Sequence, residues 1–127
     1  MEEQVVSKHR VANYGEVYTR KREVEAMLDL VRQETVRIES RFLEPACGTG
    51  NFLGEILERK LKVVEKRYKK SQLDFERNAA LTVSSIYGID LLKDNVEECR
   101  KRLFAIFDWT YKNLYKKKKK MQIFQER

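Results

Sequence analysis

The sequence predicts an α/β fold in which helices dominate and enclose a small parallel sheet, in the order helix, strand, helix, strand, helix. Two short apolar runs have the composition of buried strands, and the longer segments around them carry apolar residues at helical spacing. Strands joined by a helical crossover run parallel, in a right-handed βαβ unit. A chain of 127 residues fits one domain, so we expect a single domain over residues 1–127.

The first predicted helix lies in "TRKREVEAMLDLVRQETVRI", residues 19–38. Val24, Met27, Leu28 and Val31 fall at helical spacing and form one apolar face. Thr19 stands where a helix N-cap belongs, because its hydroxyl can accept a hydrogen bond from a free N–H of the first turn. The pattern predicts an amphipathic helix that begins after Thr19.

The first predicted strand is "RFLE", Arg41–Glu44, an apolar run that Pro45 and a glycine-rich turn bring to an end. A helical pattern follows the turn and continues through the charged stretch "EKRYKKSQLDFERN", which requires either one long helix or two. The apolar positions of this pattern are Leu53, Ile56, Leu57, Leu61, Val64 and Tyr68. The second predicted strand covers about Ser85–Ile89, where β-branched and aromatic residues precede and surround Gly88.

The last predicted helix follows the second strand and carries a single apolar stripe. The stripe consists of Val96, Cys99, Leu103, Ile106 or Phe107, Thr110 and Leu114. Phe104, Phe107, Trp109 and Tyr111 could form a platform on which nucleic-acid bases stack, but their helical spacing favours packing in the core or an interface.

The net charge of +7 and the run "YKKKKK", Tyr115–Lys120, favour polyanionic partners. A solvated helix end or tail is the ordinary explanation for such a run, and we expect residues 116–127 to form a basic tail. The run leaves open a second function, a non-enzymatic basic module that binds nucleic acid or a partner subunit. Cys47 and Cys99 suggest no disulfide framework or metal cluster, and no apolar segment predicts export or a membrane span, so we expect a cytoplasmic protein.

Gly48 and Gly50 lie between the first strand and a helix, where backbone N–H groups and the positive helix end face a ligand that glycine lets approach closely. Asp90, at the tip of the second strand, can accept hydrogen bonds from both hydroxyls of a ribose. No lysine followed by serine or threonine comes after the turn, which excludes a P-loop. The glycines at 48, 50 and 54 also overlap the loose dinucleotide pattern, so a nicotinamide- or flavin-binding protein is a third possibility.

The stretch "EPACGTGNFL", Glu44–Leu53, resembles motif I of the adenine-specific, amino-methylating DNA methyltransferases of restriction-modification systems. In that motif an acidic residue precedes Pro-Ala-Cys-Gly-Ser/Thr-Gly and an apolar helix start. Two further stretches agree in order: "YGEVYT", Tyr14–Thr19, resembles the family's N-terminal cofactor motif, and "IYGIDLLKDNVEECRKRL", Ile86–Leu103, resembles its second-strand motif. The resemblance implies a partial Rossmann-like methyltransferase fold.

The resemblance further implies S-adenosylmethionine as the cofactor. Its methionine end would lie at the glycine-rich turn near Thr19, Glu44 would help to orient the amine, and Leu91 would cover one face of the adenine. Asp90 would hold the ribose hydroxyls. The residues that the resemblance assigns to the cofactor are Thr19, Glu44, Pro45, Ala46, Cys47, Gly48, Thr49, Gly50, Asp90 and Leu91.

Arg20 stands where the family commonly has proline, and proline would preorganise the first helical position. Cys47 is expected to be a small residue in a tight turn, because methyl transfer in this family goes directly from the sulfonium to the amine and needs no cysteine nucleophile.

The family catalyses with a later motif, Asn or Asp followed by Pro-Pro and an aromatic residue, which holds the target amine and stacks on the flipped base. Pro45 is the single proline of this sequence, so residues 1–127 do not contain that motif. We therefore expect a truncated S-adenosylmethionine-binding domain without catalytic residues, inactive alone, whose partners are DNA in the complete enzyme and the missing C-terminal half or a companion subunit. A two-stranded sheet also leaves apolar surface uncovered, which favours a homodimer or such a companion.

Overall fold

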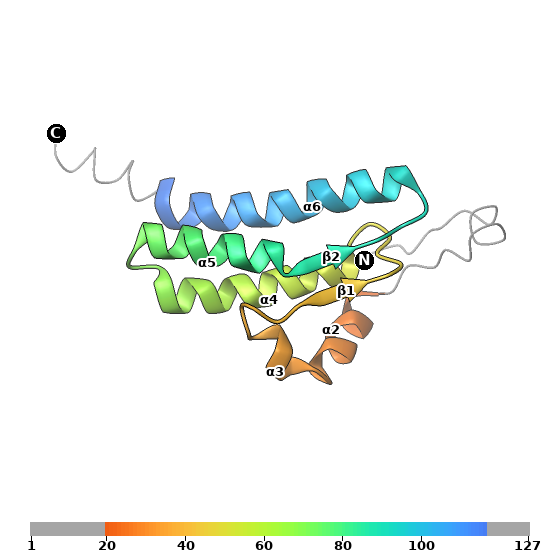
Figure 1. Ribbon diagram of the computed structural model, residues 1–127, viewed down its shortest axis with the longest axis horizontal. Helices are drawn as coiled ribbons and strands as arrows, with labels where there is room; N and C mark the ends of the chain where they lie inside the picture. Colours follow the sequence, from red (N-terminus) through yellow and green to blue (C-terminus); the bar gives the residue numbers. More distant parts are fainter. Residues whose placement is uncertain (1–19, 117–127) are drawn as a thin grey trace.

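The computed structural model describes residues 20–116 and contains a two-stranded sheet packed against helices (Figure 1). Strands β1 (Phe42–Glu44) and β2 (Ile86–Gly88) are parallel, with Phe42 opposite Ile86 and Glu44 opposite Gly88. The ladder continues past both ends, since the Phe42 N–H donates to the Ser85 carbonyl (2.9 Å) and the Ile89 N–H to the Glu44 carbonyl (3.0 Å). The helix-dominated α/β prediction with a small parallel sheet is confirmed.

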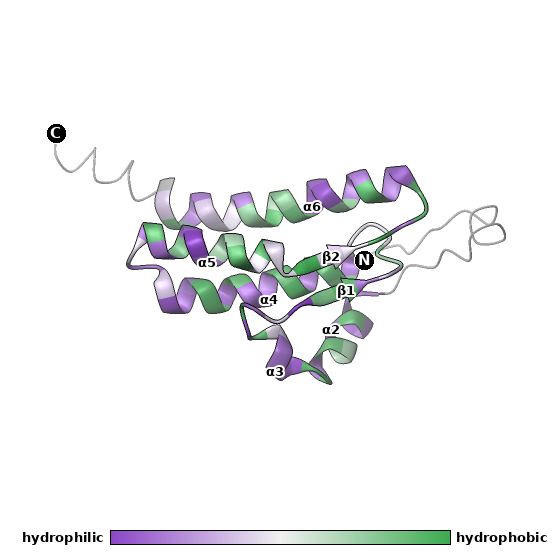
Figure 2. Cartoon of the chain, in the orientation of Figure 1, coloured by the Kyte–Doolittle hydropathy of each residue, from purple (hydrophilic) through white to green (hydrophobic). Residues whose placement is uncertain are grey.

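Helices make up most of the described chain. They are α2 (Lys21–Asp29), α3 (Arg32–Thr35), α4 (Asn51–Tyr68), α5 (Gln72–Ser84), α6 (Lys93–Tyr111) and the π-helical turn η1 (Lys112–Lys116). The longer helices carry both hydrophobic and hydrophilic residues along their length, as amphipathic helices do (Figure 2).

The first helix is shorter than its sequence pattern predicts. Arg20 occupies the N-cap position of α2, without a side-chain capping bond, so the prediction of Thr19 as N-cap is wrong by one residue. Val24 and Leu28 are buried, whereas Met27 is 54% exposed within the helix and Val31 is 40% exposed beyond its end at Asp29. The chain then turns through α3 towards β1.

The crossover from β1 to β2 consists of two helices. α4 ends at Tyr68, and the connection to α5 holds Ser71, whose hydroxyl accepts a hydrogen bond from the Asp74 N–H (3.3 Å). This bond satisfies one of the free N–H groups of a helix start. A serine cap, without proline or glycine, therefore divides the charged region that the sequence left as one helix or two.

Two hydrophobic clusters hold the helices to the sheet, and α4 contributes to both. The cluster nearer the glycine-rich turn contains Val24, Leu28, Cys47, Leu53, Ile56 and Cys99. The cluster nearer the α4–α5 connection contains Ile38, Leu57, Leu61, Val64, Phe75 and Ala79. α4 is thus the central element, and it runs from the glycine-rich turn to the connection with α5.

The predicted packing of the α6 aromatics is correct for two of the four. The Phe107 and Tyr111 rings are stacked with centroids 6.4 Å apart, and Tyr111 also lies 6.4 Å from the Phe75 ring. Phe104 and Trp109, by contrast, are 68% and 69% exposed. These two side chains lie outside the core, so for them the prediction stands only in its interface form.

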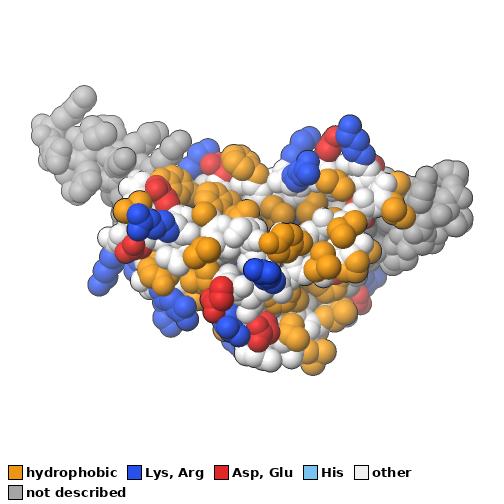
Figure 3. Space-filling model, in the orientation of Figure 1, with side chains coloured by type: hydrophobic (Ala, Val, Ile, Leu, Met, Phe, Trp, Pro, Cys, Tyr) orange, Lys and Arg blue, Asp and Glu red, His pale blue; other side chains and the backbone are white. Residues whose placement is uncertain are grey.

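The sheet is covered unevenly. α4 and α5 both contact β2, but a hollow of about 650 Å³ opens over the strands, lined by Leu43, Tyr87 and Ile89 among others. These three side chains are exposed, and Figure 3 shows hydrophobic side chains gathered over this part of the molecule. Among residues 20–116 no helix combines the length and apolar character that a bilayer crossing demands.

Candidate functional site

The turn after β1 is built from positive-φ glycines and hydrogen bonds to the neighbouring strand. Gly48 has φ 54° and Gly50 has φ 94°, conformations that residues with a Cβ rarely adopt. The Cys47 N–H donates to the Ile89 carbonyl (2.9 Å), and the Gly50 N–H donates to the Cys47 carbonyl (2.9 Å). The chain therefore reverses tightly into α4, and the free N–H groups of the helix start lie at the turn.

Two glycines of the site are also required by packing. A Cβ on Gly50 would lie 2.8 Å from Cys99 Sγ of α6, and a Cβ on Gly88 would lie 2.6 Å from Leu53 Cδ1. Both distances are shorter than van der Waals contact allows. Gly50 thus lets α6 approach the turn, and Gly88 lets α4 approach β2, a reason that the sequence pattern alone did not reveal.

Asp90 joins the two strand ends. Its Oδ2 accepts a hydrogen bond from the Gly48 N–H (3.0 Å), and its Oδ1 accepts bonds from the Leu92 N–H (2.8 Å) and the Asn95 side-chain amide (3.2 Å). The predicted ribose acceptor and the predicted glycine-rich turn are therefore in direct contact across 42 positions of sequence. A charged acceptor bound to N–H groups is a strong hydrogen-bonding arrangement, so Asp90 fixes the turn relative to β2.

The other predicted site residues lie around this contact. Glu44 closes β1 and its carboxylate accepts a hydrogen bond from the Ala46 N–H (3.0 Å). Pro45 and Ala46 are exposed, Thr49 is half-buried, and Leu91 is 88% exposed beside Asp90. Thr19 lies outside the described residues. The remaining predicted positions gather at the carboxyl ends of the two strands, the edge where ligands bind in open parallel sheets.

The thiol of Cys47 is buried behind the turn and packs in the same cluster as Cys99. Burial raises the pKa of Cys47 to about 11, and burial likewise raises the pKa of Cys99. A nucleophilic cysteine needs an accessible thiolate, whereas this thiol stays protonated at neutral pH. Cys47 thus has the properties of a packing residue, as the sequence analysis expected.

Sequence reasoning missed a polar contact at the start of α4. Arg102 Nη1 of α6 donates to Asn51 Oδ1 of α4 (2.6 Å). The two residues line a small hollow of about 60 Å³ together with Lys21 of α2 and Gly54. Three helices therefore meet beside the glycine-rich turn. Arg102 lies three positions after Cys99 and therefore on the same face of α6, which packs against α4. This spacing could have indicated the contact.

Sequence reasoning also missed Lys60, which is fully buried beneath the strands. Its Nζ donates to the Ile38 carbonyl (3.2 Å), to the Ser40 carbonyl and to Ser85 Oγ (2.7 Å), and it lies 5.1 Å from the centroid of the Phe42 ring. Burial lowers the pKa of Lys60 to about 8. Because Ser40 precedes β1 and Ser85 precedes β2, this one side chain ties the beginnings of both strands together.

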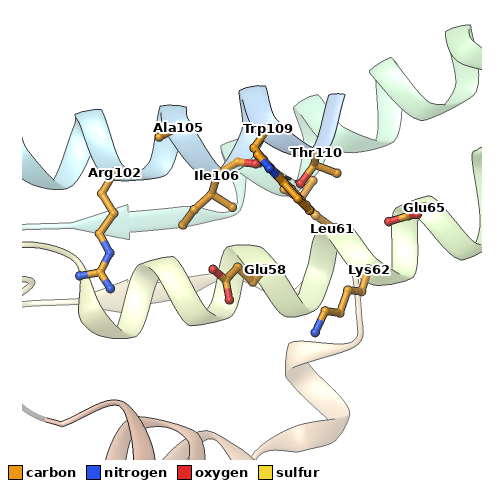
Figure 4. Close-up of a pocket in the computed structure, with 9 residues that line it drawn as sticks. All are labelled: Glu58, Leu61, Lys62, Glu65, Arg102, Ala105, Ile106, Trp109 and Thr110. Carbon is orange, nitrogen blue, oxygen red and sulfur yellow. Dashed lines mark hydrogen bonds between the residues drawn. The ribbon is translucent and has the colours of Figure 1, made fainter. Parts of the chain in front are cut away.

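A separate groove of about 490 Å³ lies between α4 and α6 (Figure 4). Leu61, Ala105, Ile106 and Trp109 supply its apolar surface, and charged side chains of both helices surround it. None of the residues predicted for the cofactor lines this groove. Within the described part of the chain, no cluster of histidine, cysteine, aspartate or glutamate side chains could hold a metal ion.

Comparison with known proteins gives one match. The family model described as MmeI, DNA-methyltransferase domain, matches residues 18–125. Searches among curated proteins and among solved structures found no match.

Proposed function

Because the chain belongs to the MmeI DNA-methyltransferase domain family, we propose that it binds S-adenosylmethionine and forms the cofactor-binding part of an adenine-specific DNA methyltransferase of a restriction-modification system. The family supports a function related to DNA methylation. The adenine specificity, the cofactor and the restriction-modification context rest on the motif resemblance at Glu44–Leu53 and Ile86–Leu103.

The observation that carries this proposal is the 3.0 Å contact between the Gly48 N–H and Asp90. The glycine-rich turn and the strand-tip carboxylate are the two groups that a nucleoside with an attached amino acid would need together. Backbone N–H groups at a helix start suit the carboxylate of the methionine end, and exposed Leu91 offers an apolar surface for the adenine.

Cofactor binding on this proposal requires an exchange of hydrogen bonds at Asp90. A carboxylate offers about four acceptor positions. Three are occupied by N–H donors from Gly48, Leu92 and Asn95, so one position is left for a ribose that presents two hydroxyls. The Gly48 bond, which links two loops, is the one that can be given up by a small movement of the turn. Its release also frees the Gly48 N–H to face the ligand.

The catalytic groups on this proposal come from another polypeptide segment. The Asn/Asp-Pro-Pro-aromatic motif needs two prolines, and Pro45 is the only proline of this sequence. The exposed apolar face formed by Leu43, Tyr87 and Ile89 supports a companion segment or subunit that completes the sheet. The chain alone is then expected to bind the cofactor without transferring its methyl group.

Isothermal titration calorimetry of the full chain tests the cofactor assignment. S-adenosylmethionine should bind to a single site, and NADH at the same concentration should give no heat of binding. NADH binding with no response to S-adenosylmethionine would instead support the nicotinamide alternative and refute the proposal. Absence of binding by both ligands, also after addition of a segment that completes the sheet, would refute both.

A further inference from the structure

Basic side chains from two distant parts of the sequence converge at the end of the molecule where α4 meets α5. Lys66 and Arg67 lie in the last turn of α4, and Lys69 and Lys70 follow in the connection. η1 packs against this connection, since the Tyr115 hydroxyl donates to the Lys69 carbonyl (3.2 Å). Figure 1 shows the α4–α5 connection and the end of α6 side by side, and Figure 3 shows Lys and Arg side chains at this end with Asp and Glu side chains among them. The basic end is defined as Lys66, Arg67, Lys69, Lys70 and Lys112.

Roles within the fold account for only part of this charge. Lys66 and Arg67 are placed where a helix C-terminus favours cations, and Lys112 forms an ion pair with Asp108 (2.8 Å). Lys69 and Lys70 lie past the helix, are exposed, and have no ion pair within the described part of the chain. Lys66, Lys69 and Lys70 are therefore exposed basic side chains within five positions of one another at the same end of α4.

We propose that the basic end binds the phosphate backbone of duplex DNA at a surface distinct from the cofactor turn. α4 has 18 residues, so the basic end lies about 27 Å from the glycine-rich turn along the helix axis. Clustered lysines bind DNA because each neutralised phosphate releases a condensed counterion.

DNA is favoured over an acidic protein by the family, whose description names DNA, and by the makeup of the surface. Lys66, Lys69 and Lys70 present flexible point charges, which suit a repeated array of phosphates. Contacts of this kind carry no base information, so binding is expected to be independent of sequence. This DNA contact does not require cofactor binding, and it adds a DNA-binding surface on this chain to the proposed function.

Two matched triple variants of the full chain test this inference. Lys66→Gln/Lys69→Gln/Lys70→Gln removes three charges from the basic end, and Lys93→Gln/Arg100→Gln/Lys101→Gln removes three exposed charges from the first half of α6. Fluorescence anisotropy with a labelled duplex of arbitrary sequence gives the dependence of log K on log salt. The magnitude of this negative slope should decrease by about 2 to 3 for the basic-end variant and by less than about 1 for the control.

Equal losses in the two variants would show a general charge effect and would overturn the inference, as would an unchanged slope in the basic-end variant. Poly-glutamate serves as a second probe: weaker binding of poly-glutamate alone, with DNA binding intact, would assign the surface to an acidic protein. Both variants should keep the melting temperature of the parent chain. Titration with S-adenosylmethionine on the same samples separates failure of this inference from failure of the cofactor proposal.

Discussion

The two ends of α4 are built in different ways. At its beginning, Gly48 and Gly50 hold positive-φ conformations, and the turn is fixed by the Asp90 contact and by the close approach of Cys99. At its other end, Lys66, Lys69 and Lys70 are exposed and without ion pairs in the described chain.

Single substitutions should therefore have different effects at the two ends of α4. At the glycine-rich turn each residue is constrained by backbone conformation and by neighbours within van der Waals contact, so a single atom matters. At the basic end the proposed binding energy for DNA is a sum of similar contributions from separate charges, so one lysine can replace another. The first end should respond to single substitutions and the second only to several together.

The largest effect is expected from Gly50→Ala. The substitution forces a residue with a Cβ into φ 94° and places that Cβ 2.8 Å from Cys99 Sγ. Backbone strain and overpacking together should lower the free energy of unfolding by about 3 kcal/mol. Urea unfolding followed by circular dichroism measures this loss.

Gly54→Ala is the matched control. Its Cβ would lie 3.4 Å from Ile106 Cδ1 within a helix, so this substitution should change the free energy of unfolding by less than about 1 kcal/mol. Equal losses would contradict the constrained turn.

A tenfold to hundredfold loss of S-adenosylmethionine affinity is expected from Asp90→Asn. The substitution keeps the shape of the side chain and removes the charged acceptor, which is worth about 1.5 to 3 kcal/mol in a charge-assisted hydrogen bond. Glu97→Gln, an exposed position on α6, removes the same charge and should leave affinity unchanged. Calorimetric titration distinguishes the two, and similar affinities of both variants would argue against ribose binding at Asp90.

The buried Lys60 predicts a pH effect on stability. Its pKa in the folded chain is lowered to about 8 from the usual 10.5, so between these values the unfolded chain binds more protons. The free energy of unfolding should therefore rise with pH through this window by an amount on the order of 1 kcal/mol, and Lys60 should add no pH dependence well below pH 8, where both states hold its proton. Cys47, with its pKa raised to about 11, acts in the opposite direction above pH 9. Comparison of the parent chain with Lys60→Met isolates the lysine, and identical pH profiles would contradict the assignment.

The smallest effect on stability is expected at the open sheet face. Leu43 is 63% exposed, so Leu43→Lys should change the free energy of unfolding by less than about 0.5 kcal/mol. The added charge should nevertheless weaken self-association, because apolar sheet surface is what the proposed partner would cover. Sedimentation velocity over a range of concentrations measures this effect. Leu73→Lys, at a position 56% exposed on α5, is the control, and equal behaviour of both variants would remove the sheet face as the contact surface.

The sequence predicted those strands whose ends are marked by residues close by in the chain. Pro45 and the glycines marked the end of β1, and the β-branched run around Gly88 marked β2 to within two residues. The same signals brought Asp90 and the glycine-rich turn to one edge, because parallel strands end side by side. The candidate site at this edge could therefore be outlined from the sequence alone.

What the sequence did not reveal depends on neighbours far along the chain. Lys60 falls on the apolar face of α4, between Leu57 and Val64, which was a signal of burial, but its three acceptors come from the loops before both strands. The packing role of Gly50 depends on Cys99 of α6, whose position beside the turn the sequence does not show. Trp109 has the spacing of a core residue yet is exposed, because periodicity cannot say whether another element covers a helix face.

Amide chemical shifts of the glycines test the central claim most directly. A ¹⁵N–¹H titration of the full chain with S-adenosylmethionine, followed into the millimolar range, should move the Gly48 and Gly50 signals strongly, since the Gly48 N–H exchanges its Asp90 bond for the ligand. The Lys69 and Lys70 signals at the far end of α4 should stay in place. Unchanged Gly48 and Gly50 signals, or shifts confined to the basic end, would contradict a cofactor site at the glycine-rich turn.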